Sequence, residues 1–188
     1  MPHFLEEIEA YVPLDEKERQ DQRVMLDLIK AFPTTILTRK QEVAHLTVSA
    51  FIMNPEQSKV LMAFHNIFQS FAWTGGHADG NPQLLEVALT EAREETGIKN
   101  PQPLSTEIAS LDILPVWSHV KKGKVVSSHL HLNVTYLLIA SEDEMLAIKE
   151  DENSAVSWLP VSELNQYCKE PDMMPVYEKL IERAKAFK

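Results

Sequence analysis

Residues 75–98 read GGHADGNPQLLEVALTEAREETGI, and this stretch decides the fold because it joins a glycine-rich turn to an amphipathic helix. Apolar side chains recur with the helical period over residues 83–96 and form one stripe: Leu85, Ala88, Leu89 and Ala92. Gly97 follows the last turn, where a glycine commonly ends a helix in the left-handed conformation. The pattern therefore predicts a helix over 83–96 with one buried edge.

The next edge of this helix carries three carboxylates. At about 100° per residue, Glu91, Glu94 and Glu95 spread over about 100° of one helix face. Like charges this close repel each other by a few tenths of a kcal/mol per pair, so a compensating cation is expected. Mg²⁺ prefers such oxygen ligands, whereas a Glu-rich helix surface is also common as a plain solvated face. The charges alone leave both interpretations open.

Working outward from the helix, alternation with a period of two predicts strands on both sides. Residues 45–52 and 59–64 are predicted to form a hairpin around the turn at 54–58, and two further strands are expected at 106–120 and 125–140, joined by a turn at 121–124. A short strand at 155–159 precedes helices near 161–167 and 172–187. This order predicts an α/β (α+β) fold in which helices cover a mixed sheet.

The first forty residues have a different pattern. Two helices are predicted, with Asp15 as the N-cap of the second, which would span 15–31. The second helix is polar up to residue 24, so it is expected to lie on the surface and pack only through its second half. We assign 1–40 to an N-terminal helical extension and 41–188 to the main domain; the extension could equally serve as a dimerisation arm.

Composition limits the partners of the chain. Its 188 residues include 18 Lys and Arg against 28 Asp and Glu, a formal net charge of −10, which disfavours nucleic-acid polymers and anionic membranes. Cys168 is the one cysteine, and the N-terminus has glutamates where a signal peptide would be basic, so a cytoplasmic location is predicted. An anionic substrate could approach such a protein where a cation reverses the local field.

The segment from Gly76 to Ile98 resembles the Nudix box of the Nudix hydrolase superfamily. The positions that match are Gly76, Glu91, Ala92, Glu94, Glu95, Gly97 and Ile98. Two positions depart from the box: Pro82 replaces a glutamate and Thr90 replaces the arginine that supports the first glutamate of the core. The likeness covers most of residues 43–167 and implies a Nudix-like α/β/α sandwich with a mixed central sheet.

The resemblance implies an Mg²⁺- or Mn²⁺-dependent hydrolase. Such an enzyme cleaves a diphosphate linkage in a nucleoside diphosphate derivative or similar small molecule by water attack on phosphorus. The implied metal-binding residues are Gly75, Glu91, Glu94 and Glu95. The assignment of Glu91 is weaker than that of Glu94 and Glu95, because the arginine that would hold Glu91 in place is missing. The implied catalytic residues are Glu91, Glu94 and Glu152. The general base could be Glu91 or one of the loop carboxylates at 150–152, among which Glu152 is favoured. The other interpretation of residues 150–152 is a plain solvated loop.

Candidate substrate-binding residues are His77, Asp79, His129 and His131. The two histidines at 129 and 131 share a strand face with Asn133 and Thr135, and this face is predicted to look into a ligand cleft. The alternatives are loop capping for His77, a turn aspartate for Asp79, and a structural or exposed position for the strand histidines.

Two other functions remain as alternatives. One is a Nudix-fold ligand-binding or regulatory module with weak or no turnover, which the departures at Pro82 and Thr90 would permit. The other is an isopentenyl-diphosphate isomerase, which the position of Cys168 after the final strand disfavours. A homodimer is the favoured assembly because family members frequently form dimers.

Overall fold

The computed structural model describes residues 3–67, 69–121 and 123–187. Within these residues the main sheet has eight strands in the order β10-β2-β1-β9-β5, with β3 paired to β2, β4 to β1 and β6 to β9. The strands are β1 (Ala44–Met53), β2 (Lys59–His65), β3 (Ser70–Ala72), β4 (Thr74–His77), β5 (Gln102–Pro103), β6 (Ser110–Val116), β9 (His129–Ile139) and β10 (Asn153–Pro160). The helices are α1 (His3–Ala10), α2 (Glu16–Ala31), α3 (Leu84–Thr96), α4 (Leu164–Tyr167) and α5 (Met174–Ala184), with 3₁₀ turns at Val161–Glu163 and Lys185–Phe187.

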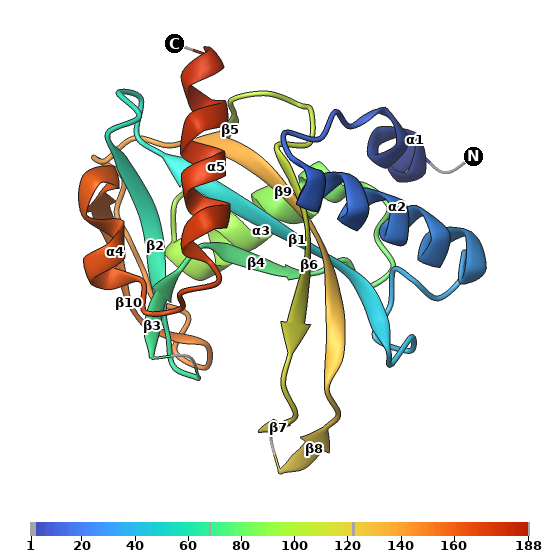
Figure 1. Cartoon of the computed structure of the whole chain (residues 1–188). Helices are drawn as coiled ribbons and strands as arrows, with labels where there is room; N and C mark the ends of the chain where they lie inside the picture. Colours follow the sequence, from blue (N-terminus) through green and yellow to red (C-terminus); the bar gives the residue numbers. More distant parts are fainter. Residues whose placement is uncertain (1–2, 68, 122, 188) are drawn as a thin grey trace.

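Helices cover both faces of the sheet, with α5 in front and α3 behind in Figure 1. One apolar cluster joins α1, α2 and α3 to alternate residues of β1, including Leu46 and Val48. A second cluster joins α4 and α5 to the other face of β1, where Phe51 stacks on Tyr177. The predicted α/β/α sandwich with a mixed sheet is confirmed: β1 runs parallel to β9 and antiparallel to β2 and β4.

The predicted hairpin of β1 and β2 forms, but the two strands separate early. They pair at Ile52–Leu61 and Met53–Val60, and β4 then takes the place of β2 beside β1. Thr47 to Ala50 of β1 face His77 to Thr74 of β4 in antiparallel register. This exchange places Gly75 and Gly76 beside β1 and next to α3.

The expectation that the second helix packs only through its second half is wrong. Asp15 caps α2 as predicted, but Glu18 in the first half is 0% exposed. Glu18 accepts hydrogen bonds from the Tyr11 hydroxyl at 2.5 Å and from the Leu14 amide at 2.7 Å. Its carboxylate also pairs with Lys179 of α5 at 2.8 Å, a cation more than a hundred residues away that the local pattern of α2 cannot reveal.

The N-terminal helices share the core of the rest of the chain. Phe4, Ile8 and Met25 belong to the same apolar cluster as β1 and α3. The division into an extension at 1–40 and a domain at 41–188 stays a prediction, and this shared core leads us to expect that removing residues 1–40 would destabilise the remainder.

The two long strands β6 and β9 continue into a smaller two-stranded sheet, β7 (His119–Lys121) and β8 (Lys124–Val126), which projects from the body in Figure 1. The predicted turn at 121–124 lies here, with Gly123 at φ +78°, although its Lys122 is outside the described residues. No helix in the described part of the chain is long and apolar enough to cross a membrane.

Candidate functional site

The carboxylate end of α3 lies directly against the glycines of β4. The Gly75 amide donates a hydrogen bond to Oε1 of Glu95 at 2.8 Å. A Cβ atom added to Gly76 would lie 2.1 Å from Oε1 of Glu91, so a side chain at this position would collide with that carboxylate. The two glycines therefore let the strand approach two of the three glutamates that the helical pattern brought to one face.

The loop that precedes β10 packs on the last turn of α3. Gly97 ends the helix at φ +78°, and the Ala147 amide then donates to the Thr96 carbonyl at 2.8 Å. Asn153, which is buried, donates from Nδ2 to the Glu95 carbonyl at 3.0 Å and accepts from the Lys149 amide at 3.2 Å. These backbone contacts fix the loop that carries Lys149 and Glu152 beside the helix.

Lys149 lies among the acidic side chains. Its Nζ atom is 3.1 Å from Oε2 of Glu152 and 3.5 Å from Oε2 of Glu94. Lys149 was not among the predicted site residues, although a lysine directly before the acidic run 150–152 was a visible signal. An ammonium group here indicates that the cluster attracts cations.

Burial shapes the electrostatics of the cluster. Burial raises the pKa of the Glu95 carboxyl to about 8, against the opposing hydrogen bond from Gly75, and repulsion from Glu91 adds to the rise. Burial also raises the pKa of Glu91, while the charge of Lys149 opposes that rise and Glu94 and Glu152 add to it. A bound cation would compensate both carboxylates.

The donor set fits a hard divalent cation. Glu91, Glu94, Glu95 and Glu152 offer carboxylate oxygens, the ligand type that Mg²⁺ and Mn²⁺ prefer. Arg93 does not support Glu91, because its Nε points to the Lys99 carbonyl at 3.4 Å. Thr90 and Pro82 are exposed. The box arginine is missing here, and the positive charge that acts on Glu91 is that of Lys149.

Asp79 is engaged elsewhere. Both of its carboxylate oxygens accept hydrogen bonds from Arg39, at 3.0 and 2.5 Å. Its backbone adopts φ +46°, as expected of a turn aspartate beside Gly80. The geometry thus gives Asp79 a loop-bracing contact, which was the structural alternative for this residue.

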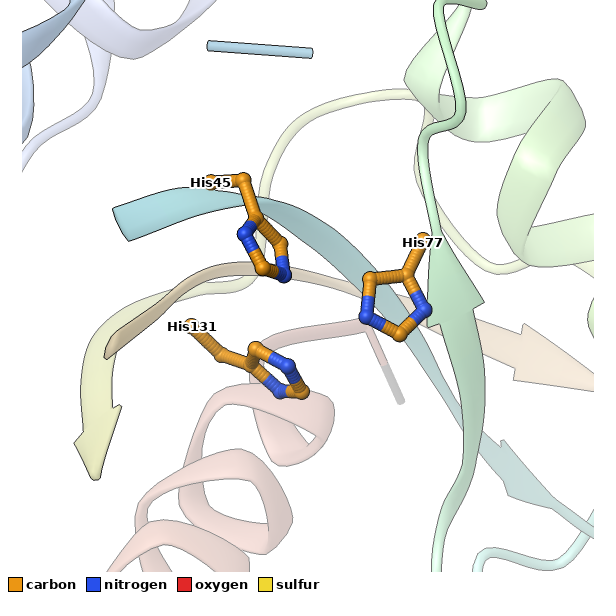
Figure 2. A group of neighbouring side chains, drawn as sticks. All are labelled: His45, His77 and His131. Atoms are coloured by element: carbon orange, nitrogen blue, oxygen red, sulfur yellow. The ribbon is translucent and has the colours of Figure 1, made fainter. Parts of the chain in front are cut away.

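The predicted histidines gather around a fourth one, His45. His45, His77 and His131 come from β1, β4 and β9, and their ligand nitrogens all lie within 4.8 Å of one another. Figure 2 shows the three rings around a common space. The ring of His129 stacks on that of His45 with centroids 5.0 Å apart. His45 was missed because its nearness to His131 depends on the parallel pairing of β1 with β9.

The strand face beyond these histidines is closed. Asn133 accepts hydrogen bonds from Thr47 at 3.0 Å and Ser49 at 2.9 Å, and donates to Thr135 at 3.0 Å. Asn133 and Thr135 are buried, so this part of the face predicted to look into a ligand cleft is satisfied internally. His129 and His131, which are partly exposed, remain as the accessible part of the predicted strand face.

Comparison with known proteins identifies one family. The family model for the NUDIX domain matches residues 43–183. A curated relative, the m7GpppN-mRNA hydrolase NUDT17 of Xenopus laevis, is 29% identical over 124 residues; the match covers 60% of this chain but 38% of the length of that relative.

Solved structures share the fold at low identity. A NUDIX-family hydrolase from Clostridium perfringens superposes with a TM-score of 0.52 at 22% identity, covering 77% of this chain and 98% of the other. The NUDIX domain of Shewanella oneidensis NrtR, solved in complex with ADP ribose, gives a TM-score of 0.53 at 18% identity and covers 82% of this chain and 97% of that domain.

Proposed function

Because this chain belongs to the NUDIX domain family, we propose that it is a pyrophosphohydrolase-type hydrolase that cleaves a diphosphate linkage in a nucleoside diphosphate derivative by water attack on phosphorus. The observation that carries the proposal is the contact of Glu91 and Glu95 with the two glycines of β4, with Lys149 bound among the neighbouring carboxylates. This arrangement concentrates oxygen ligands where an anionic substrate would otherwise be repelled.

We assign metal binding to Glu91, Glu94, Glu95 and the backbone at Gly75. Bound Mg²⁺ or Mn²⁺ would neutralise the diphosphate oxygens and lower the pKa of a bound water. Glu95 is held in place by the Gly75 amide, and Glu91 by the close passage of Gly76. Glu94 is the most exposed of the three, with 55% of its side chain accessible, and is therefore the one that reaches farthest toward solvent and substrate.

Glu152 is the proposed proton acceptor. Its side chain is 36% exposed, so water can reach it, and it lies across from Glu94 with Lys149 in contact with both. Glu91 is the alternative, and burial raises the pKa of this carboxyl. A general base must lie within hydrogen-bonding reach of the attacking water, which favours the more accessible carboxylate.

A panel of diphosphate compounds tests the proposal against a pure ligand-binding module. The full chain is incubated with Mg²⁺ and ADP-ribose, other nucleoside diphosphate derivatives and nucleoside triphosphates, and cleavage and thermal stabilisation are measured side by side. Mg²⁺-dependent cleavage of at least one compound is expected. Thermal stabilisation without cleavage of any compound would support the binding module instead.

Gly76→Ala is expected to lower activity with little loss of stability. The new methyl group collides with the carboxylate of Glu91, at the end of a side chain that can rotate, rather than with backbone atoms. The carboxylate must therefore move away, whereas β4 can keep its place in the sheet. We expect kcat/KM to fall by about 10-fold or more, in line with a displaced metal-site residue. Circular dichroism melting provides the check on folding.

The control for this substitution is Lys124→Ala on the distant β8, where the side chain is exposed. Equal activity of Gly76→Ala and the wild type would show that Glu91 does not need its present position.

Lys149→Gln is expected to lower the Mg²⁺ concentration needed for half-maximal activity several-fold. The lysine ammonium and the metal compete for Glu94 and Glu152, so its removal strengthens the negative field that a cation experiences. The measurement is activity as a function of Mg²⁺ concentration, with Lys124→Gln on the distant β8 as the control. An increased Mg²⁺ requirement would mean that Lys149 supports the site instead of competing for it.

Three further sequence-based assignments stay predictions: substrate contact by His77, Asp79, His129 and His131, a homodimer, and a cytoplasmic location. The Arg39 contact of Asp79 leads us to expect an indirect role for that residue, through the position of the loop after β4.

A further inference from the structure

We propose that His45, His77 and His131 form a second metal site, which binds a divalent transition-metal ion of the Zn²⁺ type separately from the carboxylate site of α3. The inference does not depend on the proposed hydrolase function. It rests on the convergence of three rings from three strands, shown in Figure 2, and on the buried, unpartnered Nε2 atom of His45.

The distances suit a metal that binds imidazole. Zn²⁺ bonds His nitrogen at about 2.0–2.1 Å, which puts two tetrahedral ligands about 3.3 Å apart. The three ligand nitrogens lie within 4.8 Å of one another, so each ring needs to move by less than about 1 Å to reach a common ion. Within the described part of the chain, His45, His77 and His131 are the metal-ligating side chains found to bring three ligand atoms this close together.

His45 provides an independent observation. Its Nδ1 lies 2.9 Å from the Gln41 carbonyl, which can only accept, so Nδ1 carries the proton and Nε2 has a lone pair. That Nε2 atom is buried and has no hydrogen-bond partner, in a residue that is only 4% exposed. A buried nitrogen without a partner is costly, and a metal ion would supply the missing interaction.

His129 acts as a positioning residue. Its Nδ1 donates to the Ser127 carbonyl at 2.8 Å, so its Nε2 is an acceptor, and it lies 3.2 Å from Nε2 of His131. In this arrangement His131 would donate from Nε2, which leaves the lone pair of its Nδ1 atom to bind a metal. Metal-bound histidines commonly have such an outer hydrogen bond, which fixes the tautomer and orients the ring.

Burial disfavours the charged form of two of the rings. Burial lowers the pKa of His131 to about 3, and the neighbouring histidines His77, His45 and His129 lower it further. Burial likewise lowers the pKa of His45. The assignment rests on the geometry of the three rings and on the unpartnered Nε2 atom of His45.

The site is distinct from the carboxylates. Along β1, His45 alternates with Leu46 and Val48, which belong to the apolar cluster of α3, so the histidine lies on the opposite face of the sheet. On β4, Gly76 faces Glu91 and His77 therefore faces away from it. Nitrogen ligands select Zn²⁺, whereas the oxygen ligands of α3 select Mg²⁺. Three protein ligands also leave a fourth position open for water or an anionic group.

A zinc titration tests the site. The full-length chain is stripped with a chelator, dialysed and titrated with Zn²⁺ in competition with a chromogenic indicator, and Co²⁺ is used for the absorption spectrum. We expect one Zn²⁺ per chain at this site, retained in excess Mg²⁺. His77→Gln and His131→Gln should weaken binding by about 100-fold or more, and His129→Gln by about 10- to 100-fold.

Two matched controls separate the outcomes. His3→Gln, at an exposed histidine of α1, and Glu94→Gln should both bind Zn²⁺ as the wild type does. Wild-type affinity in His77→Gln and His131→Gln, or loss of binding in Glu94→Gln instead, would overturn the proposal. If a histidine variant fails to fold, NMR of the wild type still decides: Zn²⁺ must shift the ring signals of His45, His77 and His131, and unchanged signals would refute the site.

Discussion

Glu94→Gln is expected to lower kcat/KM for Mg²⁺-dependent diphosphate cleavage by about 10²- to 10³-fold, because a metal-neutralised transition state is stabilised by several kcal/mol. The substitution keeps the shape of the side chain and removes the charge. Glu94 is exposed and its ion pair with Lys149 is long, at 3.5 Å, so folding should be nearly unaffected. The measurement is steady-state turnover of a compound identified in the diphosphate panel, across a range of Mg²⁺ concentrations.

Glu86→Gln is the matched control for this experiment. Glu86 lies on the same helix but in its first turn, is exposed, and is separate from the carboxylates near Gly75 and Gly76. Turnover of Glu86→Gln should equal that of the wild type. Full activity of Glu94→Gln would show that the metal assignment on α3 is wrong even if the chain is an active hydrolase.

Glu18→Gln is expected to cause the largest loss of stability. Glu18 is fully buried and pairs with Lys179 at 2.8 Å and Arg183 at 3.4 Å. Its neutralisation removes a carboxylate from both cations and leaves Lys179 with Asp112, at 2.9 Å, as its remaining buried carboxylate. Removing one member of a buried ion pair costs about 3–5 kcal/mol. For a chain of this size the melting temperature should fall by about 6–20 °C.

Glu16→Gln on the same helix is the control, because 72% of the Glu16 side chain is exposed and its pair with Arg19 contributes little. Thermal melting followed by circular dichroism compares the two variants. A melting temperature of Glu18→Gln equal to that of Glu16→Gln would mean that the N-terminal helix is not anchored through this carboxylate.

Local patterns predicted the helix that carries the candidate site well. The helical period over 83–96, the three glutamates and the terminal Gly97 describe α3 as it is observed, from Leu84 to Thr96. These features depend on residues within a few turns of one another, so spacing alone is sufficient to predict them.

Long-range contacts account for what the sequence did not reveal. Lys149 reaches Glu94 because a loop packs on the end of α3, and His45 meets His131 because two distant strands run parallel. Glu18 is buried because α5 brings Lys179 to it. In each case the partner lies far away in sequence, and periodicity carries no information about such pairs.

The most direct test of the central claim is hydrolysis in water labelled with heavy oxygen, with the products followed by phosphorus NMR. If the carboxylate end of α3 supports water attack on phosphorus, one phosphorus-containing product of a cleaved diphosphate compound gains the label, and both Mg²⁺ removal and Glu94→Gln suppress its formation. Cleavage that leaves every phosphorus unlabelled, or that persists unchanged without a divalent metal, would contradict the proposed function.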